Sequence, residues 1–211
     1  TTDTAALANG MVSVCATGSK IGGHKTHVKA LEIRTAGLGG DSLIQWDKGR
    51  FYIGPRRVAP VAWLGATYPG ADRALKFLDM HLDRHAVSTR DMQILALTGS
   101  AENLAVTPQE EKILTLLNSR PFSIDELIKR TGVLFEKSLN LERLEENFII
   151  QRCGLTLTDL LHVTDRFDRW SKESAQSYCR MFSRLTKMDI ADLAEHLLDM
   201  GVERLTLELL K

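Results

Sequence analysis

The spacing of apolar residues changes near residue 70, and this change constrains the fold most. Up to about residue 68, short runs rich in Val, Ile, Thr and aromatic residues are separated by Gly and Asn, a pattern typical of strands joined by tight turns. Beyond that point the apolar residues recur at helical spacing. We therefore predict an α+β chain with a sheet-rich N-terminal half and a mainly helical C-terminal half. The expected strands are Thr4–Leu7, Met11–Ala16, His27–Arg34, Ser42–Trp46 and Arg50–Ile53.

Two turns in the first half have the residues that tight hairpins require. Asn9-Gly10 lies between two strand-like runs, and both residues tolerate the positive φ angles of a type I′ turn. Asp47-Lys48-Gly49 lies between Leu43–Trp46 and Phe51–Ile53 in the same manner. The sequence therefore predicts two hairpins in this half.

The second half contains helix-start and helix-stop signals. Thr107-Pro108-Gln109-Glu110 combines an N-cap residue, a first-turn Pro and a capping-box Glu, and Ser123 with Glu126 begins another helix that Gly132 ends. Phe148–Arg152 is predicted to be a single short strand. The other expected helices are Ala71–His85, Glu136–Asn147, Thr158–His162, Ser171–Leu185, Asp189–Met200 and Val202–Leu210.

Charge and cysteine usage exclude some classes of partner and suggest a compartment. The 27 Lys and Arg residues balance the 27 Asp and Glu residues, so nothing in the charge favours nucleic acid or an anionic membrane. No apolar run approaches the roughly 20 residues that a membrane-spanning helix needs. Three widely spaced cysteines fit reduced thiols better than disulfides. A cytoplasmic protein is expected.

Two hydroxyl- and glycine-rich segments are candidates for binding a phosphate. Backbone N–H groups and Thr hydroxyls can donate to phosphoryl oxygens, and glycine allows the close approach of the backbone. An adjacent carboxylate can hold Mg²⁺ together with substrate oxygens. The first segment is Thr1, Thr2 and Asp3, with Asp3 as the metal ligand, and the second is a turn containing Gly37, Gly39, Gly40, Asp41 and Ser42.

The order of these segments resembles the ATPase domain of the hydantoinase/oxoprolinase family. The residues that carry the likeness are the run T-T-D-T-A-A-L at position 1, I-R-T-A-G-L-G-G-D-S-L-I around Gly37–Ser42, and G-L-T-L-T-D-L-L-H-V at Gly154–Val163. In the wider superfamily of actin, sugar kinases and chaperone ATPases, a segment D-x-G-G-T-[ST]-[ST]-D forms the second phosphate loop. Residues 1–3 resemble the end of that loop, so the sequence is expected to be a piece of a longer protein.

The resemblance implies a fold, a reaction and its cofactors. Residues 1–100 would be part of an actin-like (ribonuclease H-like) ATPase lobe, 101–155 a small helical insertion like a winged helix, and 156–211 a helical segment packing back on the lobe. The intact protein would use ATP and Mg²⁺ to hydrolyse a cyclic amide or related carbonyl compound, by phosphorylating the carbonyl oxygen. The remainder of its own polypeptide, or a partner subunit, would complete the site. The 211 residues alone would bind ATP weakly or not at all. A homo-oligomer is left open as an assembly. The resemblance identifies no catalytic base.

Departures from the family pattern keep two alternatives open. Gly54-Pro55 is the part that survives of a longer family segment, and Leu157 stands where the family usually has Pro. The first alternative is a non-catalytic sensor or interaction module that keeps the actin-like hairpins. The second is a winged-helix regulator. Its recognition helix, Phe135–Asn147, carries four Glu against one Lys and one Arg, and would repel phosphates.

Other polar residues are interpreted as structural rather than chemical. The H-x-x-H pair His24 and His27 needs a third ligand to hold a metal, and His81 and His85 have no accompanying HExxH glutamate. Asp159 is expected to cap a helix and His162 to form hydrogen bonds within an interface, with general-base chemistry as the alternative. The thiol of Cys15 is expected to be buried and inert, and Arg56 with Arg57 either to clamp an anion or to be surface charges.

Overall fold

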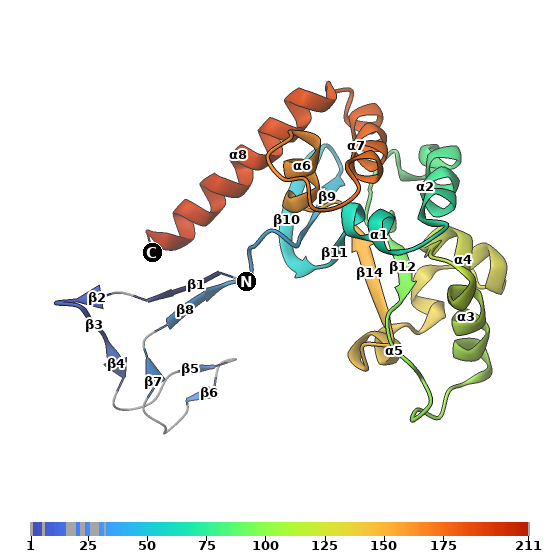
Figure 1. The fold of residues 1–211 in the computed structure, drawn as a ribbon, viewed down its shortest axis with the longest axis horizontal. Coiled ribbons are helices and arrows are strands. Elements are labelled where there is room, and N and C mark those ends of the chain that lie inside the picture. Colours follow the sequence, from blue (N-terminus) through green and yellow to red (C-terminus); the bar gives the residue numbers. More distant parts are fainter. Residues whose placement is uncertain are drawn as a thin grey trace.

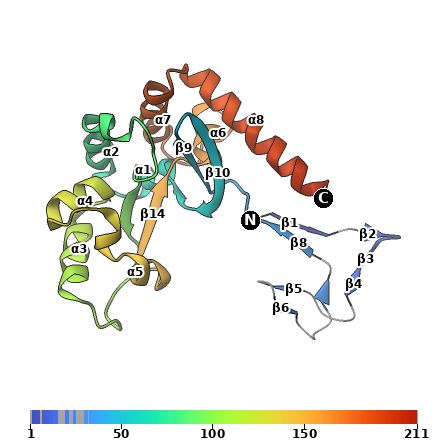
Figure 2. The same cartoon turned by 180° about the vertical axis from the view of Figure 1, so that it is seen from behind.

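The computed structural model describes residues 2–5, 7–15, 20–21, 24–25, 30–31 and 33–210. Within these residues an arm of paired strands, residues 2–36, extends to one side of a body formed by the rest of the chain (Figure 1). The view from behind shows the same arrangement, with the arm attached at the level of β9 and β10 (Figure 2). The structure is mixed α and β, with its strands in small sheets.

The arm consists of four antiparallel strand pairs. Thr2 to Ala36 and Ala5 to Ile33 are the terminal pairs of the β1–β8 ladder. At the Asn9-Gly10 turn, φ is 56° and 77°, so the predicted type I′ hairpin is confirmed. The pairs are β1 (Thr2–Ala5) with β8 (Ile33–Ala36), β2 (Leu7–Ala8) with β3 (Met11–Val12), β4 (Val14–Cys15) with β7 (Ala30–Leu31), and β5 (Lys20–Ile21) with β6 (His24–Lys25).

The body contains a second hairpin and a four-stranded sheet. β9 (Ser42–Asp47) and β10 (Arg50–Arg57) pair through a Lys48-Gly49 turn with φ of 48° and 81°, which confirms the second predicted hairpin. The sheet has the order β11-β14-β12-β13, with β11 parallel to β14 and the other pairs antiparallel. Its strands are β11 (Ala59–Pro60), β14 (Ile150–Gly154), β12 (Ile94–Leu97) and β13 (Phe122–Ser123).

Eight α-helices and two 3₁₀ helices surround these strands within the described part of the chain. The predicted starts at Thr107, Ser123 and Ser171 are confirmed, since each side chain accepts a hydrogen bond from the first turn of its helix. Gly132 ends its helix with φ of 80°, as predicted. The helices are α1 (Val61–Thr67), α2 (Ala71–Met80), η1 (Leu82–His85), α3 (Pro108–Ser119), α4 (Ile124–Thr131), η2 (Glu136–Leu139), α5 (Glu142–Glu146), α6 (Leu157–Val163), α7 (Lys172–Thr186) and α8 (Ile190–Leu209).

The buried side chains form two clusters that meet at β12. Ile94 and Ala96 belong to a first cluster with the residues that α1, α2, α6, α7 and α8 bury. Leu95, between them, belongs to a second cluster with residues from α3, α4 and α5. Successive side chains of a strand point to opposite faces, so β12 forms the boundary between the two clusters. The second cluster draws its residues from 95 to 150, the region predicted as a helical insertion.

Four sequence predictions about individual elements are wrong. Residues 61–67 form helix α1 inside the half predicted as sheet, and β12 and β13 are strands inside the half predicted as helical. The expected helix 136–147 is interrupted at Asn140, whose φ is 53°, and becomes η2 and α5. The two helices expected around Gly201 are one helix, α8. Gly201 is buried there, and a Cβ at this position would lie 2.9 Å from Leu157, so close packing explains the glycine.

None of the helices in the described residues is both long and apolar enough to span a bilayer.

Candidate functional site

The predicted glycine turn, residues 37–42, joins the arm to the body between β8 and β9. The Ser42 N–H donates to the Gly39 carbonyl at 3.0 Å, and the Gly39 N–H donates to the Ser42 hydroxyl oxygen at 2.9 Å. Ser42 is completely buried. One backbone N–H and the one hydroxyl of the turn therefore bond to each other.

Strand β1 carries Thr2 and Asp3, which belong to the first predicted segment. The Thr2 hydroxyl donates to the Leu38 carbonyl at 2.8 Å. The Thr35 hydroxyl donates to Asp3 Oδ1 at 2.6 Å across the β1–β8 ladder, and Asp3 is exposed. The structure thus brings Thr2 into contact with the turn, and Asp3 lies one residue further along β1, where it contacts Thr35; Thr1 lies outside the described residues.

The segment at the start of α6 packs on the same turn from the other side. The Thr158 N–H and hydroxyl donate to the Gly40 carbonyl at 2.9 and 2.8 Å, and the Ile44 N–H donates to the Leu155 carbonyl at 2.8 Å. A Cβ at Gly40 would lie 2.7 Å from Thr158 Oγ1. Glycine at position 40 therefore allows two segments more than 110 residues apart to touch.

Gly54 and Pro55 of β10 pack against Gly37 of the turn. Gly54 has φ of 63°, and a Cβ there would lie 2.9 Å from the Gly37 carbonyl oxygen. A Cβ at Gly37 would lie 3.3 Å from that of Pro55. Three stretches singled out in the sequence, 37–42, 54–55 and 154–163, thus meet at one place, which we call the glycine junction.

Both arginines after Pro55 form ion pairs with carboxylates. Arg57 Nε lies 2.6 Å from Asp41 Oδ2, and this contact raises the pKa of Arg57. Arg56 lies 3.3 Å from Glu145. The negative charge of Asp41 is therefore compensated by Arg57.

Asp159 is fully buried and connects α6 to α1. Its Oδ1 accepts from the Ala62 N–H at 2.7 Å, and its Oδ2 accepts from the N–H and hydroxyl of Thr156 at 2.9 and 2.8 Å. Burial raises the pKa of Asp159 to about 6, although these hydrogen bonds act in the opposite direction. The predicted capping role is confirmed, and the carboxylate also supports the start of α1.

The ring of His162 packs among aromatic side chains. It is completely buried, and neither ring nitrogen has a hydrogen-bond partner among the described residues. Its centroid lies 4.9 Å from that of Phe167 and 5.8 Å from that of Trp170. The expectation that His162 hydrogen-bonds is not met within the described part of the chain; aromatic packing holds the ring.

Among the described side chains, the remaining candidate histidines, His81 and His85, do not form a site together. His81 Nδ1 lies 2.8 Å from the Phe77 carbonyl, and His85 Nε2 lies 3.1 Å from Asp125, so the two rings interact with different elements. The side chains of His24 and Cys15, and all of His27, lie outside the described residues. Among the residues that are described, no group of three or more His, Cys, Asp or Glu side chains could hold a metal ion.

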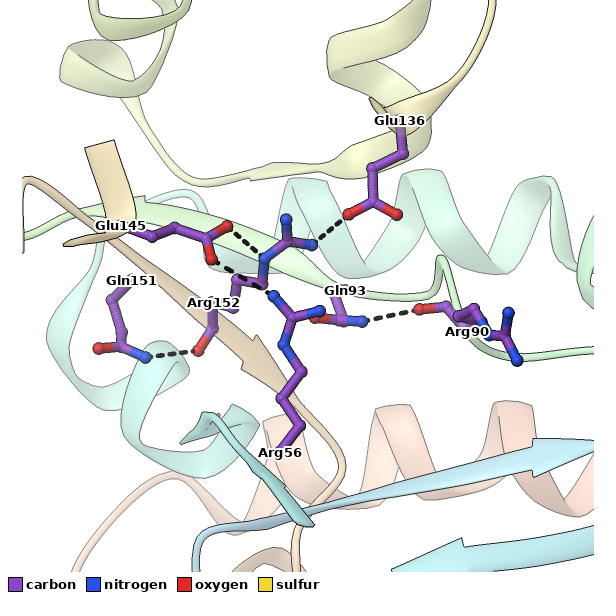
Figure 3. A network of polar contacts seen from close by, with 7 residues as sticks. All are labelled: Arg56, Arg90, Gln93, Glu136, Glu145, Gln151 and Arg152. Carbon is purple, nitrogen blue, oxygen red and sulfur yellow. Dashed lines mark hydrogen bonds and ion pairs between the residues drawn. The ribbon is translucent and has the colours of Figure 1, made fainter. Parts of the chain in front are cut away.

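A network of charges that the sequence analysis missed lies between the sheet and the second cluster. Arg152 of β14 pairs with Glu136 and Glu145, and Glu145 also pairs with Arg56 of β10 (Figure 3). Arg152 is only 8% exposed, and its partners line a hollow of about 230 Å³. Arg56 and Glu145 are 89 residues apart, and Arg152 is 7 and 16 residues from Glu145 and Glu136, so no helical or strand periodicity indicates these contacts.

The largest of the hollows described for this structure lies away from the glycine junction. Its volume is about 490 Å³, and it lies between α1, α2 and α7, with Tyr68, Gly70 and Ser174 in its wall. None of its lining residues belongs to the glycine junction.

Comparison of the chain with protein-family models, with curated proteins and with solved structures found no match.

Proposed function

We propose that the protein is an ATP-dependent hydrolase of cyclic amides or related carbonyl compounds, with the glycine junction at its nucleotide site. One observation carries this proposal. Two stretches that resemble the hydantoinase/oxoprolinase family, 37–42 and 154–163, are far apart in the sequence and touch through Thr158 and Gly40, and Thr2 of the stretch 1–3 contacts the same turn at Leu38. Such convergence is expected of residues that act on one ligand and is not required of unrelated turns.

Asp3 is the residue through which this chain contributes charge to the reaction. Its carboxylate is exposed on β1, next in the chain to Thr2, which contacts the turn, and Mg²⁺ binds well to one or two carboxylates together with phosphate oxygens. ATP with Mg²⁺ supplies the activation of the amide carbonyl, and the protein positions the reactants. On this proposal the other half of the phosphate cradle comes from polypeptide outside residues 1–211 or from a partner subunit.

The test is phosphate release from ATP by the natural polypeptide that contains these residues, with and without 5-oxoproline or hydantoin. Asp3→Asn keeps an oxygen that can accept from Thr35 and removes only the charge. We expect amide-dependent phosphate release to fall by about 100-fold or more, because a lost metal ligand costs several kcal/mol of transition-state stabilisation. Asp168→Asn, at an exposed position between α6 and α7, is the control and should leave the rate unchanged.

A second candidate is a nucleotide-binding or interaction module without turnover. The observation in its favour is that the polar groups of the junction already bond to one another, as in the Ser42–Gly39 pair and the Asp41–Arg57 ion pair. ATP binding without any amide-dependent phosphate release would favour this candidate and contradict the hydrolase.

A further inference from the structure

One face of the arm is apolar and exposed. Val14 and Leu31 are cross-strand partners in the β4–β7 pair, so their side chains share a face, and Ile33 begins the next strand, β8. Their exposed fractions are 56%, 50% and 50%. An isolated two-stranded ribbon is only marginally stable in water. The arm therefore needs a surface to pack against.

The last two turns of α8 expose a second apolar surface. The first part of this helix is buried, with Leu193, Ala194 and Leu197 in the first cluster. Val202, Leu207 and Leu210 near its end are 64%, 55% and 80% exposed. At about 100° per residue these three positions lie within an arc of roughly 140°. They therefore form one stripe, which also contains Glu203 and Thr206. The stripe lies towards the C-terminal end of α8, the end that Figures 1 and 2 show extending beyond α6 and α7.

Contacts on the other side of α8 hold the helix so that this stripe faces outward. Arg204 donates to the Ile53 carbonyl of β10, and Gly201 packs against Leu157 of α6. The helix is thus anchored to the body up to residue 204. The direction of the stripe is set by the fold of the body.

The arm and helix α8 differ in the sign of the net charge of their sequences. Residues 2–36 of the arm contain four basic residues, Lys20, Lys25, Lys29 and Arg34, and two acidic residues, Asp3 and Glu32. Helix α8 contains five acidic residues, Asp192, Glu195, Asp199, Glu203 and Glu208, and one basic residue, Arg204. The arm is therefore basic overall and the helix acidic, which favours an encounter between them.

We infer that the partner of both surfaces is a second copy of this chain: the apolar face of each arm packs on the α8 stripe of the other copy. Within one chain both surfaces are exposed at the same time, so the arm does not cover its own helix. A two-fold exchange covers both surfaces on both copies with one kind of contact. The formal net charge of zero imposes no long-range repulsion between copies. This inference does not depend on the nucleotide chemistry.

The test is the mass of the chain in solution, measured by sedimentation equilibrium over a range of concentrations. We expect twice the mass of a single chain, with weaker association at high salt because charges contribute. Leu31→Lys on the arm and Leu207→Lys on α8 should each raise the dissociation constant at least 10-fold. Both positions are at least half exposed, so circular dichroism should show an intact fold. Leu134→Lys, at an 88% exposed position between α4 and η2, is the matched control and should not change the constant.

Mixing the two variants distinguishes exchange from other dimers. A pair made of one Leu31→Lys chain and one Leu207→Lys chain can form one contact with no substituted residue. The mixture should therefore associate more tightly than either variant alone. A wild-type chain that stays monomeric at all concentrations, whether its arm is free or closed on its own helix, would overturn the inference. A dimer that neither variant weakens would overturn it equally.

Discussion

At Asp159 a single buried carboxylate joins segments that are far apart in the sequence. It completes the capping box of α6 with Thr156 and accepts from the Ala62 N–H of α1, 97 residues away. Transfer of its negative charge from water into the core costs free energy, and burial therefore raises the pKa of Asp159 to about 6. The group is thus well bonded and still costs stability when it is ionised.

The stability of the protein should depend on pH through Asp159. Because its pKa of about 6 in the fold exceeds the ordinary 3.8, the folded protein binds the proton first as the pH falls from 7 to 4. Wild type should gain about 2.4 kcal/mol over this interval relative to Asp159→Asn, which cannot titrate. Urea unfolding of both proteins at several pH values measures the difference. A constant difference between the two curves would contradict the prediction.

Replacing Gly54 by alanine should destabilise the protein more than replacing Gly49, which lies in the same hairpin. Gly54 and Gly49 both have positive φ, 63° and 81°, but only a Cβ at Gly54 would meet a backbone oxygen, at 2.9 Å. Gly49→Ala should cost about 1–2 kcal/mol from the backbone conformation alone. Gly54→Ala should cost at least about 1 kcal/mol more, because Gly37 must also move. Thermal unfolding of the two variants measures the difference, and equal costs would contradict a close approach at the glycine junction.

At the scale of elements, local sequence determines where helices start. Whether a short strand or a short helix forms depends instead on its tertiary contacts. The capping box at Thr107 and Glu110 and the N-cap at Ser123 form as predicted, since each needs only residues within one turn. Helix α1 has seven residues, and its first N–H groups bond to Asp159. The strand β12 pairs on both sides, with β13 and β14. Elements as short as these depend on tertiary contacts.

The capping box of α3 is reinforced by a distant arginine, and this can be tested. Glu110 accepts from the Thr107 N–H at 2.7 Å and pairs with Arg143 of α5, and the hydrogen bond from Arg143 lowers the pKa of Glu110 to about 2. Glu110→Gln should destabilise the protein by about 1–2 kcal/mol at pH 7, since Arg143 is partly exposed and screened. This contribution is present above pH 4.5 and is lost as the pH falls towards 2.

The neighbouring residue Glu111 is the control for this prediction. It is exposed in the same first turn of α3, so Glu111→Gln loses the same charge near the helix start without losing the contact to Arg143. Its cost should be below about 1 kcal/mol. Chemical unfolding at pH 7 compares the two variants, and equal effects would show that the Arg143 contact contributes nothing.

At the scale of the whole molecule, β12 couples the two clusters of buried side chains. Ile94 and Ala96 face one cluster and Leu95 the other, and the Arg152 network adds charged contacts across the same boundary. Neither cluster can lose its part of β12 without disturbing the other. We therefore expect the two clusters to unfold together.

Destabilisation of the second cluster by a substitution should shift the unfolding transition that the tryptophans of the first cluster report by fluorescence. Leu127 of α4 is fully buried in the second cluster, whereas Trp46 and Trp63 pack on the first and Trp170 lies beside His162. Leu127→Ala should cost about 2–5 kcal/mol and shift the tryptophan fluorescence transition as far as the circular dichroism transition. Leu134→Ala, at an exposed position, should shift neither. Two separate transitions would mean that the clusters unfold independently.

The sequence by itself determined the features that depend on neighbouring residues. These are the change from strands to helices, both hairpin turns, and the helix starts at Thr107, Ser123 and Ser171. It also singled out the segments that meet at the glycine junction, because glycine and hydroxyl residues mark close backbone approaches. Their function remains a proposal.

Only the tertiary structure decided which of these segments touch and how their polar groups are used. The contact of Thr158 with Gly40 spans 118 residues, and the pairing of Arg57 with Asp41 and of Arg152 with Glu136 has no local signature. The same holds for α1, β12 and the unbroken course of α8 past Gly201. Local sequence sets backbone preferences of a few tenths to about 1 kcal/mol per residue. Burial and long-range hydrogen bonds contribute more at each of these positions, so they determined the outcome.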